Sequence, residues 1–115
     1  MPFTEFELKY IEKTVGKMCE LRSPTHLHDK LQIVFEVKGY DVIVSEKRPR
    51  WDDPLQWLNM PIAKFKFIKK DKVWKLYWMR KDMKWHSYFE MPNSSKNLEA
   101  LVQEVDGDPQ GAFFG

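Results

Sequence analysis

One segment of the chain gathers side chains of the kinds that bind polyanions. Between Lys64 and Tyr88 the sequence has nine Lys or Arg residues and seven Phe, Trp or Tyr residues, opposed only by Asp71 and Asp82. Nine basic and two acidic residues give the segment a formal charge of +7, and because the whole chain carries +2, the remainder carries −5. Ammonium groups attract phosphates and aromatic rings stack on unpaired bases. The segment therefore predicts a surface for single-stranded nucleic acid or another polyanion.

A second group of residues has the chemistry of a metal site. His26, His28 and Asp29 supply imidazole and carboxylate ligands of the kind that transition metals prefer. They come directly after Ser23-Pro24, a dipeptide that favours a turn, so we expect them in a polar loop.

The pair Glu36 and Lys38, preceded by Asp29, has the Glu-x-Lys spacing of metal-dependent nucleases. In those enzymes carboxylates hold Mg²⁺ and the lysine assists the attacking water. Here Lys38 is expected in a turn, and the separation of Asp29 from Glu36 is short for that architecture. No Ser-His-Asp or Cys-His arrangement and no glycine-rich phosphate loop is present either. We expect no catalytic residue, no metal site and no cofactor, and keep a metal-dependent nuclease as the remaining enzymatic alternative.

Cysteine content and hydropathy restrict the class of protein. Cys19 is the only cysteine and lies on an apolar helical stripe, which favours a packed core thiol over a reactive one. The chain opens without the apolar region of a signal peptide, and no apolar run is long enough to cross a bilayer. These features predict a soluble, cytoplasmic protein with no membrane partner.

The first element expected along the chain is an amphipathic helix. Thr4 and Glu7 have the spacing of a capping box, in which each side chain bonds a free backbone amide at the helix start. Apolar residues then recur at helical spacing from Leu8 to Met18, and Ser23-Pro24 ends the segment.

Alternation of apolar and polar residues predicts five strands after this helix. The first two form a hairpin through Lys38-Gly39, and Pro49 ends the second because proline cannot donate to a strand ladder. The last three have short connections and must be antiparallel neighbours. The expected strands are residues 31–37, 40–48, 62–69, 73–80 and 84–89.

Two other segments have helix signals. Asp53-Pro54 resembles a helix start and predicts a short helical turn between Arg50 and Pro61. Asn93-Ser94-Ser95 can cap a final helix that stops at Gly107. After this helix, Phe113-Phe114 is expected to dock on the core of the domain.

These elements predict the fold class. At 115 residues the chain forms a single domain, residues 1–115. We expect an α+β fold in which a five-stranded, mainly antiparallel sheet, a hairpin followed by a three-strand meander, carries the N- and C-terminal helices on one face.

The pleat of the last three strands sorts the basic-aromatic segment into two faces. One set is almost wholly apolar and is expected beneath the helices: Phe65, Phe67, Trp74, Leu76, Trp78, Trp85 and Phe89. The opposite set cannot be buried without desolvating several ammonium groups, at several kcal/mol each. It is therefore expected to face water: Lys64, Lys66, Lys75, Tyr77, Met79, Lys84, His86 and Tyr88.

Rings among cations on an open sheet face are how several RNA-binding modules hold unpaired bases. Basic residues before the third strand can extend the track, whereas Glu36 and Glu46 are expected on the same face and would dilute its charge. The predicted binding residues are Arg48, Arg50, Lys64, Lys66, Lys75, Tyr77, Lys84, His86 and Tyr88.

Two explanations compete with nucleic-acid binding. Lysines and tyrosines on a solvated sheet face are common and need no ligand at all. Alternatively Tyr77, Met79, Tyr88 and the terminal phenylalanines could meet a protein partner or a second copy of the chain. The predicted partners are accordingly single-stranded RNA or DNA, or a protein partner or homodimer.

Several motifs resemble those of a family of short bacterial proteins classed as a domain of unknown function. The resemblance runs from Met1-Pro2-Phe3 to the last residue, and its most specific stretches are Arg48-Pro49-Arg50-Trp51, Trp74–Arg80, Lys84–Tyr88 and Phe113-Phe114-Gly115. It implies a bacterial, single-domain, cytoplasmic protein and brings no activity, cofactor or catalytic residue. It also marks Arg48, Arg50, Trp51, His86 and Tyr88 as residues of the family's motifs.

Overall fold

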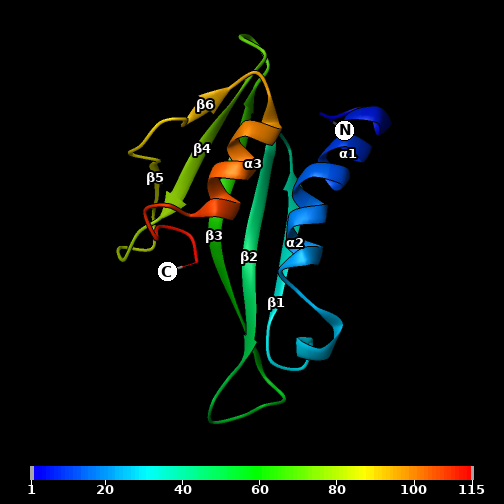
Figure 1. Cartoon of the computed structure of the whole chain (residues 1–115), viewed down its shortest axis with the longest axis vertical. Helices are drawn as coiled ribbons and strands as arrows, with labels where there is room; N and C mark the ends of the chain where they lie inside the picture. Colours follow the sequence, from blue (N-terminus) through cyan, green and yellow to red (C-terminus); the bar gives the residue numbers. More distant parts are fainter. Residues whose placement is uncertain (1, 115) are drawn as a thin grey trace.

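A meander of antiparallel strands organises residues 2–114, the part of the chain that the computed structural model describes (Figure 1). The strands run in the order β1-β2-β3-β4-β5, and β6 adds to β4. Two helical segments, one before the sheet and one after it, complete the domain. The strands are β1 (Gln32–Lys38), β2 (Asp41–Pro49), β3 (Trp57–Ile68), β4 (Val73–Met79), β5 (Trp85–Ser87) and β6 (Ser94–Ser95).

The N-terminal helical segment is continuous but changes its winding. It consists of α1 (Glu5–Ile11), a π-helical stretch η1 (Glu12–Gly16) and α2 (Lys17–Leu21), and the short 3₁₀ turn η2 (Thr25–Leu27) follows. The predicted capping box is confirmed, since Thr4 accepts from the Glu7 amide and Glu7 accepts from the Thr4 amide. At Gly16 the segment lies so close to Phe35 of β1 that an added Cβ would stand 3.1 Å from the ring.

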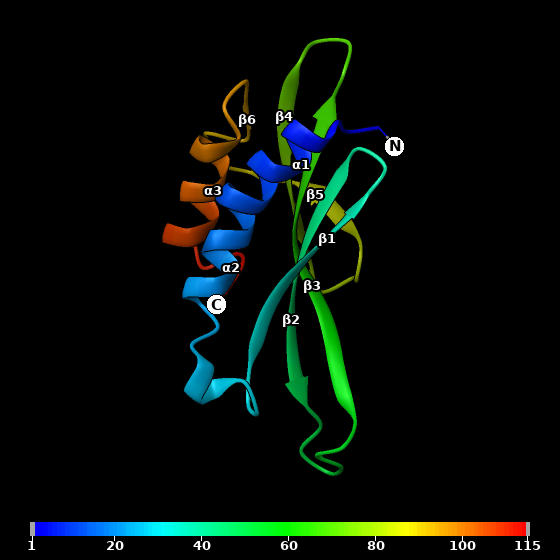
Figure 2. The same ribbon diagram turned by 90° about the vertical axis from the view of Figure 1, so that its right-hand side faces the viewer.

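Both helical segments cover the same face of the sheet, and the other face is open (Figure 2). The C-terminal helix α3 (Leu98–Gly107) lies beside the N-terminal segment, across the middle of the sheet (Figure 1). The core between helices and sheet is built from the apolar sides of both layers, including Ile11, Val15, Val42, Val44, Phe65, Leu76, Leu98 and Leu101. The predicted α+β class and the antiparallel sheet with helices at both ends of the chain are confirmed.

The helical turn predicted between Arg50 and Pro61 is wrong, because β3 begins at Trp57 and extends the hairpin with β2. Asp53 uses its carboxylate to accept the Leu55 amide within a turn and starts no helix. β2 ends at Pro49, one residue later than expected, because Pro49 still takes part in the pairing. It lies opposite Trp57, and the next bond is made by the Arg50 amide to the Gln56 carbonyl at 2.8 Å, so the position of Pro49 requires no amide proton.

The segment predicted to cap the final helix is a strand. Ser94 and Ser95 pair with Lys75 and Trp74 of β4, and the cap of α3 is Asn97, whose side chain accepts the Glu99 amide at 3.0 Å. Asparagine and serine are both good caps, so the sequence pattern alone did not separate them.

The expectation that Phe113 docks on the core is confirmed, since its side chain is only 5% exposed. Asp108 holds this tail in place by accepting the amides of Phe113 at 3.0 Å and Phe114 at 2.8 Å. Arg22 stacks on the Phe114 ring at 3.7 Å and also bonds Asp106 on α3. One charged network therefore joins the tail to both helical segments.

Replacing Asp108 by alanine tests this network. The change Asp108→Ala leaves two backbone amides without their acceptor, so we expect the free energy of unfolding to fall by about 1–3 kcal/mol. Urea denaturation followed by circular dichroism measures the loss. Asp71→Ala, in the exposed β3–β4 turn, is the matched control and should leave the midpoint unchanged. Equal midpoints for the two variants would contradict the assigned role.

Candidate polyanion-binding face

The open face of the sheet carries a group of paired basic and aromatic residues. Lys64 of β3 lies opposite Tyr77 of β4, and Lys66 lies opposite Lys75. Directly paired residues project to the same side of a sheet. The residues between them, Phe65 and Leu76, are fully buried against the helices, so the lysines and Tyr77 must point away from the helices.

The charges of these lysines are not neutralised within residues 2–114. None of the three forms an ion pair, whereas the ion pairs of the described chain involve other residues. Strand register places Asp41 of β2 beside Lys66, yet no salt bridge joins them. Like charges directly opposite each other destabilise a sheet, so Lys66 and Lys75 form a position where a bound anion would relieve repulsion.

The aromatic part of the face consists of Tyr77 and Trp85. The Lys64 ammonium lies 5.1 Å from the centroid of the Tyr77 ring and 5.2 Å from that of Trp85. Both distances are within the range of a cation–π interaction. Lys64 therefore stands between two half-buried rings, each of which keeps part of its surface in water.

The prediction that Trp85 belongs to the core is wrong, because the inferred alternation of β5 was off by one residue. The Arg80 amide donates to the Lys84 carbonyl, so these two residues close the turn, and Met83 within it has a positive φ of 62°. Trp85 consequently lies opposite Met79, on the open face. A shift of one residue exchanges the two faces of a strand.

The same shift removes Lys84 and His86 from the open face. His86 lies opposite Trp78, on the side of the helices, and its Nε2 is 2.8 Å from Oδ2 of Asp82. The hydrogen bond to His86 lowers the pKa of the Asp82 carboxyl. Lys84 follows Arg80 to that side and remains exposed at the turn.

Tyr88 was predicted to be exposed and is instead 1% exposed. Its hydroxyl donates to Oε2 of Glu104 on α3 at 2.6 Å, and its ring packs 5.1 Å from that of Phe113. Burial, followed by the hydrogen bond to Glu104, raises the pKa of Tyr88. Tyr88 therefore fastens the segment after β5 to the C-terminal helix and cannot touch a ligand on the open face.

Arg48 and Arg50 also lie apart from the lysines. Arg48 is on the helix side of β2, where it pairs with Glu46, so the expectation that Glu46 shares the open face is wrong as well. Arg50 binds Asp52 through two hydrogen bonds of 2.9 and 2.7 Å at the tip of the hairpin. Each arginine is neutralised by a carboxylate two residues away.

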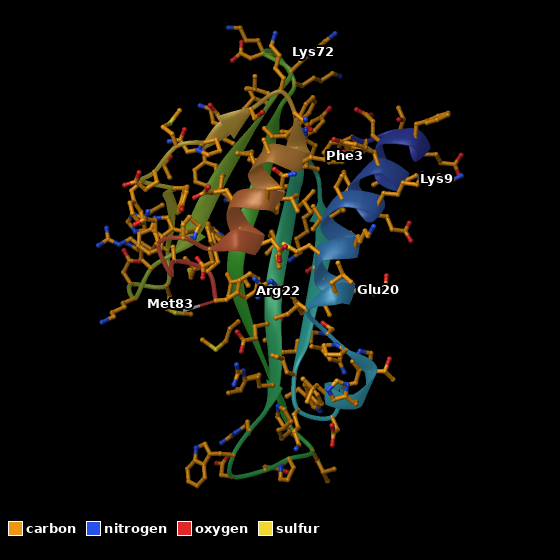
Figure 3. The ribbon with its side chains drawn as sticks, in the orientation of Figure 1. Phe3, Lys9, Glu20, Arg22, Lys72 and Met83 are labelled. Carbon is orange, nitrogen blue, oxygen red and sulfur yellow. The ribbon has the colours of Figure 1, made fainter. Side chains whose placement is uncertain are left out.

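The structure thus brings together four of the nine predicted residues, Lys64, Lys66, Lys75 and Tyr77, and adds Trp85. We call these five residues the open-face cluster. The exposed turn between β3 and β4 continues the positive charge beyond the cluster with Lys69, Lys70 and Lys72, and Figure 3 shows Lys72 at the end of the molecule. A three-residue turn at residues 81–83 pairs Arg80 with Lys84. Had this turn length been assumed for the sequence, it would have placed Trp85 on the open face.

The residues considered for metal chemistry do not assemble. Among residues 2–114, no group of three or more His, Cys, Asp and Glu side chains lies close enough to share a metal ion. Lys38 is the last residue of β1 rather than part of a turn, and it pairs with Glu36 at 3.7 Å. Asp29 precedes the opposite end of that strand.

Cys19 is buried in the core, as expected from its place on the helical stripe. Burial raises the pKa of its thiol to about 12, which keeps it protonated and unreactive near neutral pH. Among the described residues, no helix has the length and the apolar content required to cross a bilayer.

The role assigned to Tyr88 can be tested by removing its hydroxyl. Because a bond to a charged acceptor is lost, we expect Tyr88→Phe to reduce the free energy of unfolding by about 1.5–3 kcal/mol. Urea denaturation measures the change, and Tyr77→Phe on the open face is the matched control without an expected effect. A Tyr88→Phe variant as stable as the control would show that the bond to Glu104 contributes nothing.

Comparisons with known proteins identify the family of this chain but no individual protein similar to it. A family model described as a domain of unknown function (DUF3024) matches residues 3–115. Searches of curated proteins and of solved structures gave no match.

Proposed function

This chain belongs to the DUF3024 family, and on the geometry of its open face we propose that it is a binding module for polyanions, with single-stranded nucleic acid as the ligand. The ligand would lie on the open-face cluster, with phosphates on Lys64, Lys66 and Lys75 and bases on Tyr77 and Trp85. The observation that carries the proposal is the direct pairing of Lys66 with Lys75 beside two rings on a face that no helix covers.

Electrostatics supports an anionic ligand. Three ammonium groups without an ion-pair partner among residues 2–114 lie on two adjacent strands, and the lysines of the β3–β4 turn extend the charge. From Lys64 to Lys70 the track is about 20 Å long at the usual rise of a strand. Binding of phosphates along such a track releases counterions, which makes affinity fall steeply with salt.

The rings distinguish a nucleic acid from other polyanions. Stacking on an aromatic side chain contributes about 1–3 kcal/mol per base and tolerates any base sequence. Tyr77 and Trp85 flank the Lys64 ammonium, so a base that stacks on either ring places its phosphate near a cation that is already held in position. Sulfated or phosphorylated chains without bases could use the lysines but not the rings.

Reversing the charge of the face tests the electrostatic part. The triple variant Lys64→Glu, Lys66→Glu, Lys75→Glu should bind a fluorescein-labelled oligouridylate at least tenfold more weakly. The slope of log K against log salt should decrease by about 2, since each phosphate contact on a single strand contributes about 0.7. Fluorescence anisotropy at several salt concentrations measures both quantities.

The matched control places the same three charge reversals on the helical side, at Lys9, Lys13 and Lys17, which are exposed on the N-terminal segment (Figure 3 shows Lys9). This control should retain the affinity of the original protein, with folding of both variants checked by circular dichroism. If both triple variants lost affinity for the oligouridylate equally, net charge alone would explain the loss, and the proposed binding face would be wrong.

Removing the rings tests whether bases are recognised. Tyr77→Ala and Trp85→Ala should each reduce affinity for the oligouridylate by about fivefold to a hundredfold, the equivalent of one stacked base, without changing the salt slope. Trp51→Ala removes an indole that is 95% exposed on the hairpin tip and serves as the control.

A heparin fragment provides the second comparison, because it has charge but no bases. Its affinity should be unaffected by the ring variants and reduced by the lysine variant. If the ring variants also leave oligouridylate binding unchanged, the protein recognises charge alone and the nucleic-acid part of the proposal is wrong.

A further inference from the structure

The hairpin of β2 and β3 extends well beyond the rest of the sheet (Figure 1). β1 pairs with β2 only as far as Lys47, and β4 pairs with β3 only as far as Ala63. Residues 48–62, which we call the arm, therefore form a ribbon of two strands with a turn at its end. A two-stranded ribbon is marginally stable in water unless something packs against it or adds a strand.

One edge of the arm has free backbone groups. The bond from the Arg50 amide to the Gln56 carbonyl shows that residue 56 turns its backbone toward β2. Backbone groups alternate along a strand, and the register places Leu58 and Met60 opposite Arg48 and Glu46 in the same ladder. The amides and carbonyls of Trp57 and Asn59 consequently point outward, where no strand of residues 2–114 pairs with them.

This edge lacks the charged side chains that usually protect an edge strand. Edge strands commonly carry lysine or another charge that prevents pairing with a second chain. The sequence from Trp57 to Ala63 has no charged residue, and Trp57, Leu58 and Met60 are 40, 50 and 54% exposed. Only Pro61, near the bulge where register shifts between Val44 and Ser45, limits how far pairing can extend.

Both arginines of the arm are paired with carboxylates of the hairpin. Arg48 pairs with Glu46 and Arg50 pairs with Asp52, so the arm presents no free cation cluster comparable to the open-face cluster. A neutral, apolar edge is poorly suited to phosphates. The edge itself has no charged side chain that would repel the same edge of a second copy.

We infer that the arm is a self-association site, in which the outer edge of β3 pairs antiparallel with the same edge of a second copy of this chain. An antiparallel pair of identical strands is self-complementary and closes as a twofold dimer. With the axis at Asn59, the two Asn59 residues exchange amide–carbonyl bonds. Leu58 then faces Met60 and Trp57 faces Pro61 of the other copy, so all exposed apolar side chains of the edge gain a neighbour.

The association is concentration-dependent rather than obligate. Stable interfaces bury about 800 Å² on each partner, and one short strand with its side chains offers less than that. The fully buried core residues of each copy lie outside residues 48–62, and of the arm only Ile62, at its base, packs against them. This inference is independent of the proposed ligand, since it uses no residue of the open-face cluster.

Sedimentation equilibrium over the micromolar to millimolar range tests the inference. The apparent mass should rise from 13.9 kDa toward twice that value as concentration increases. Asn59→Pro removes an outward amide that β2 does not use, and Met60→Lys adds a charge to the edge, so each variant should stay at the monomer mass. Leu21→Lys, at an apolar side chain 72% exposed on α2, is the control and should associate like the original protein.

Cross-linking tests the pairing itself. Because Cys19 is buried, Asn59→Cys introduces one accessible thiol, which should form a covalent dimer under mild oxidation. In the same dimer two Trp57→Cys thiols would be about 13 Å apart along the strands and should not cross-link.

Three outcomes would overturn the inference. The first is a monomer at all concentrations, and the second is a dimer that forms equally well in both edge variants. The third is a monomer whose tryptophan fluorescence shifts to the blue with neutral phosphatidylcholine vesicles, which would assign the arm to a lipid surface instead.

Discussion

The cost of taking a lysine ammonium out of water determines how this domain is layered. Lysines alternate with apolar side chains in the part of β3 that pairs with β4, and Lys75 does so in β4. Burial of an unpaired ammonium group costs several kcal/mol. Only one arrangement keeps Lys64, Lys66 and Lys75 in solvent while Phe65 and Leu76 are covered. The helices must therefore pack on the side of Phe65, and the opposite side stays open. The candidate site follows from the same constraint that builds the core.

This constraint explains which parts of the fold could be predicted. In β3 lysines alternate with apolar residues from Ala63 to Phe67, and in β4 Lys75 stands between Trp74 and Leu76, so the phase of both strands was predicted correctly. β5 has no such contrast, since Trp85, His86 and Tyr88 suit either environment. Which of its side chains face the helices depends on the preceding turn, where Arg80 pairs with Lys84. Met83 in this turn has a left-handed conformation, which is uncommon for methionine and was not expected from the sequence. The errors at Trp85, His86 and Tyr88 all follow from this one turn.

The hairpin arm was mispredicted for a different reason. Asp53-Pro54 has the residues of a helix start, and local propensity gives no reason to reject it. What overrides it is the long-range pairing of Trp57–Met60 with Glu46–Pro49, which a local pattern does not contain. Basic residues near the tip suggested an extension of the positive track. Their neutralisation by Glu46 and Asp52 became evident only from the geometry of the side chains.

The open-face cluster and the arm lie in different parts of the molecule. The lysines of the cluster lie where β3 pairs with β4, whereas the arm extends from the other end of β3 and exposes Trp51, Leu55, Trp57, Leu58 and Met60. If two arms pair edge to edge, the twofold axis stands perpendicular to the joined sheets, because antiparallel neighbours share their faces. Both open faces then lie on the same side of the dimer. A strand long enough to reach both would bind the second face as an intramolecular step, which raises affinity without any new contact. Pairing through the neutral arm would in this way join two basic faces into one surface, about twice as long as the face of a single copy.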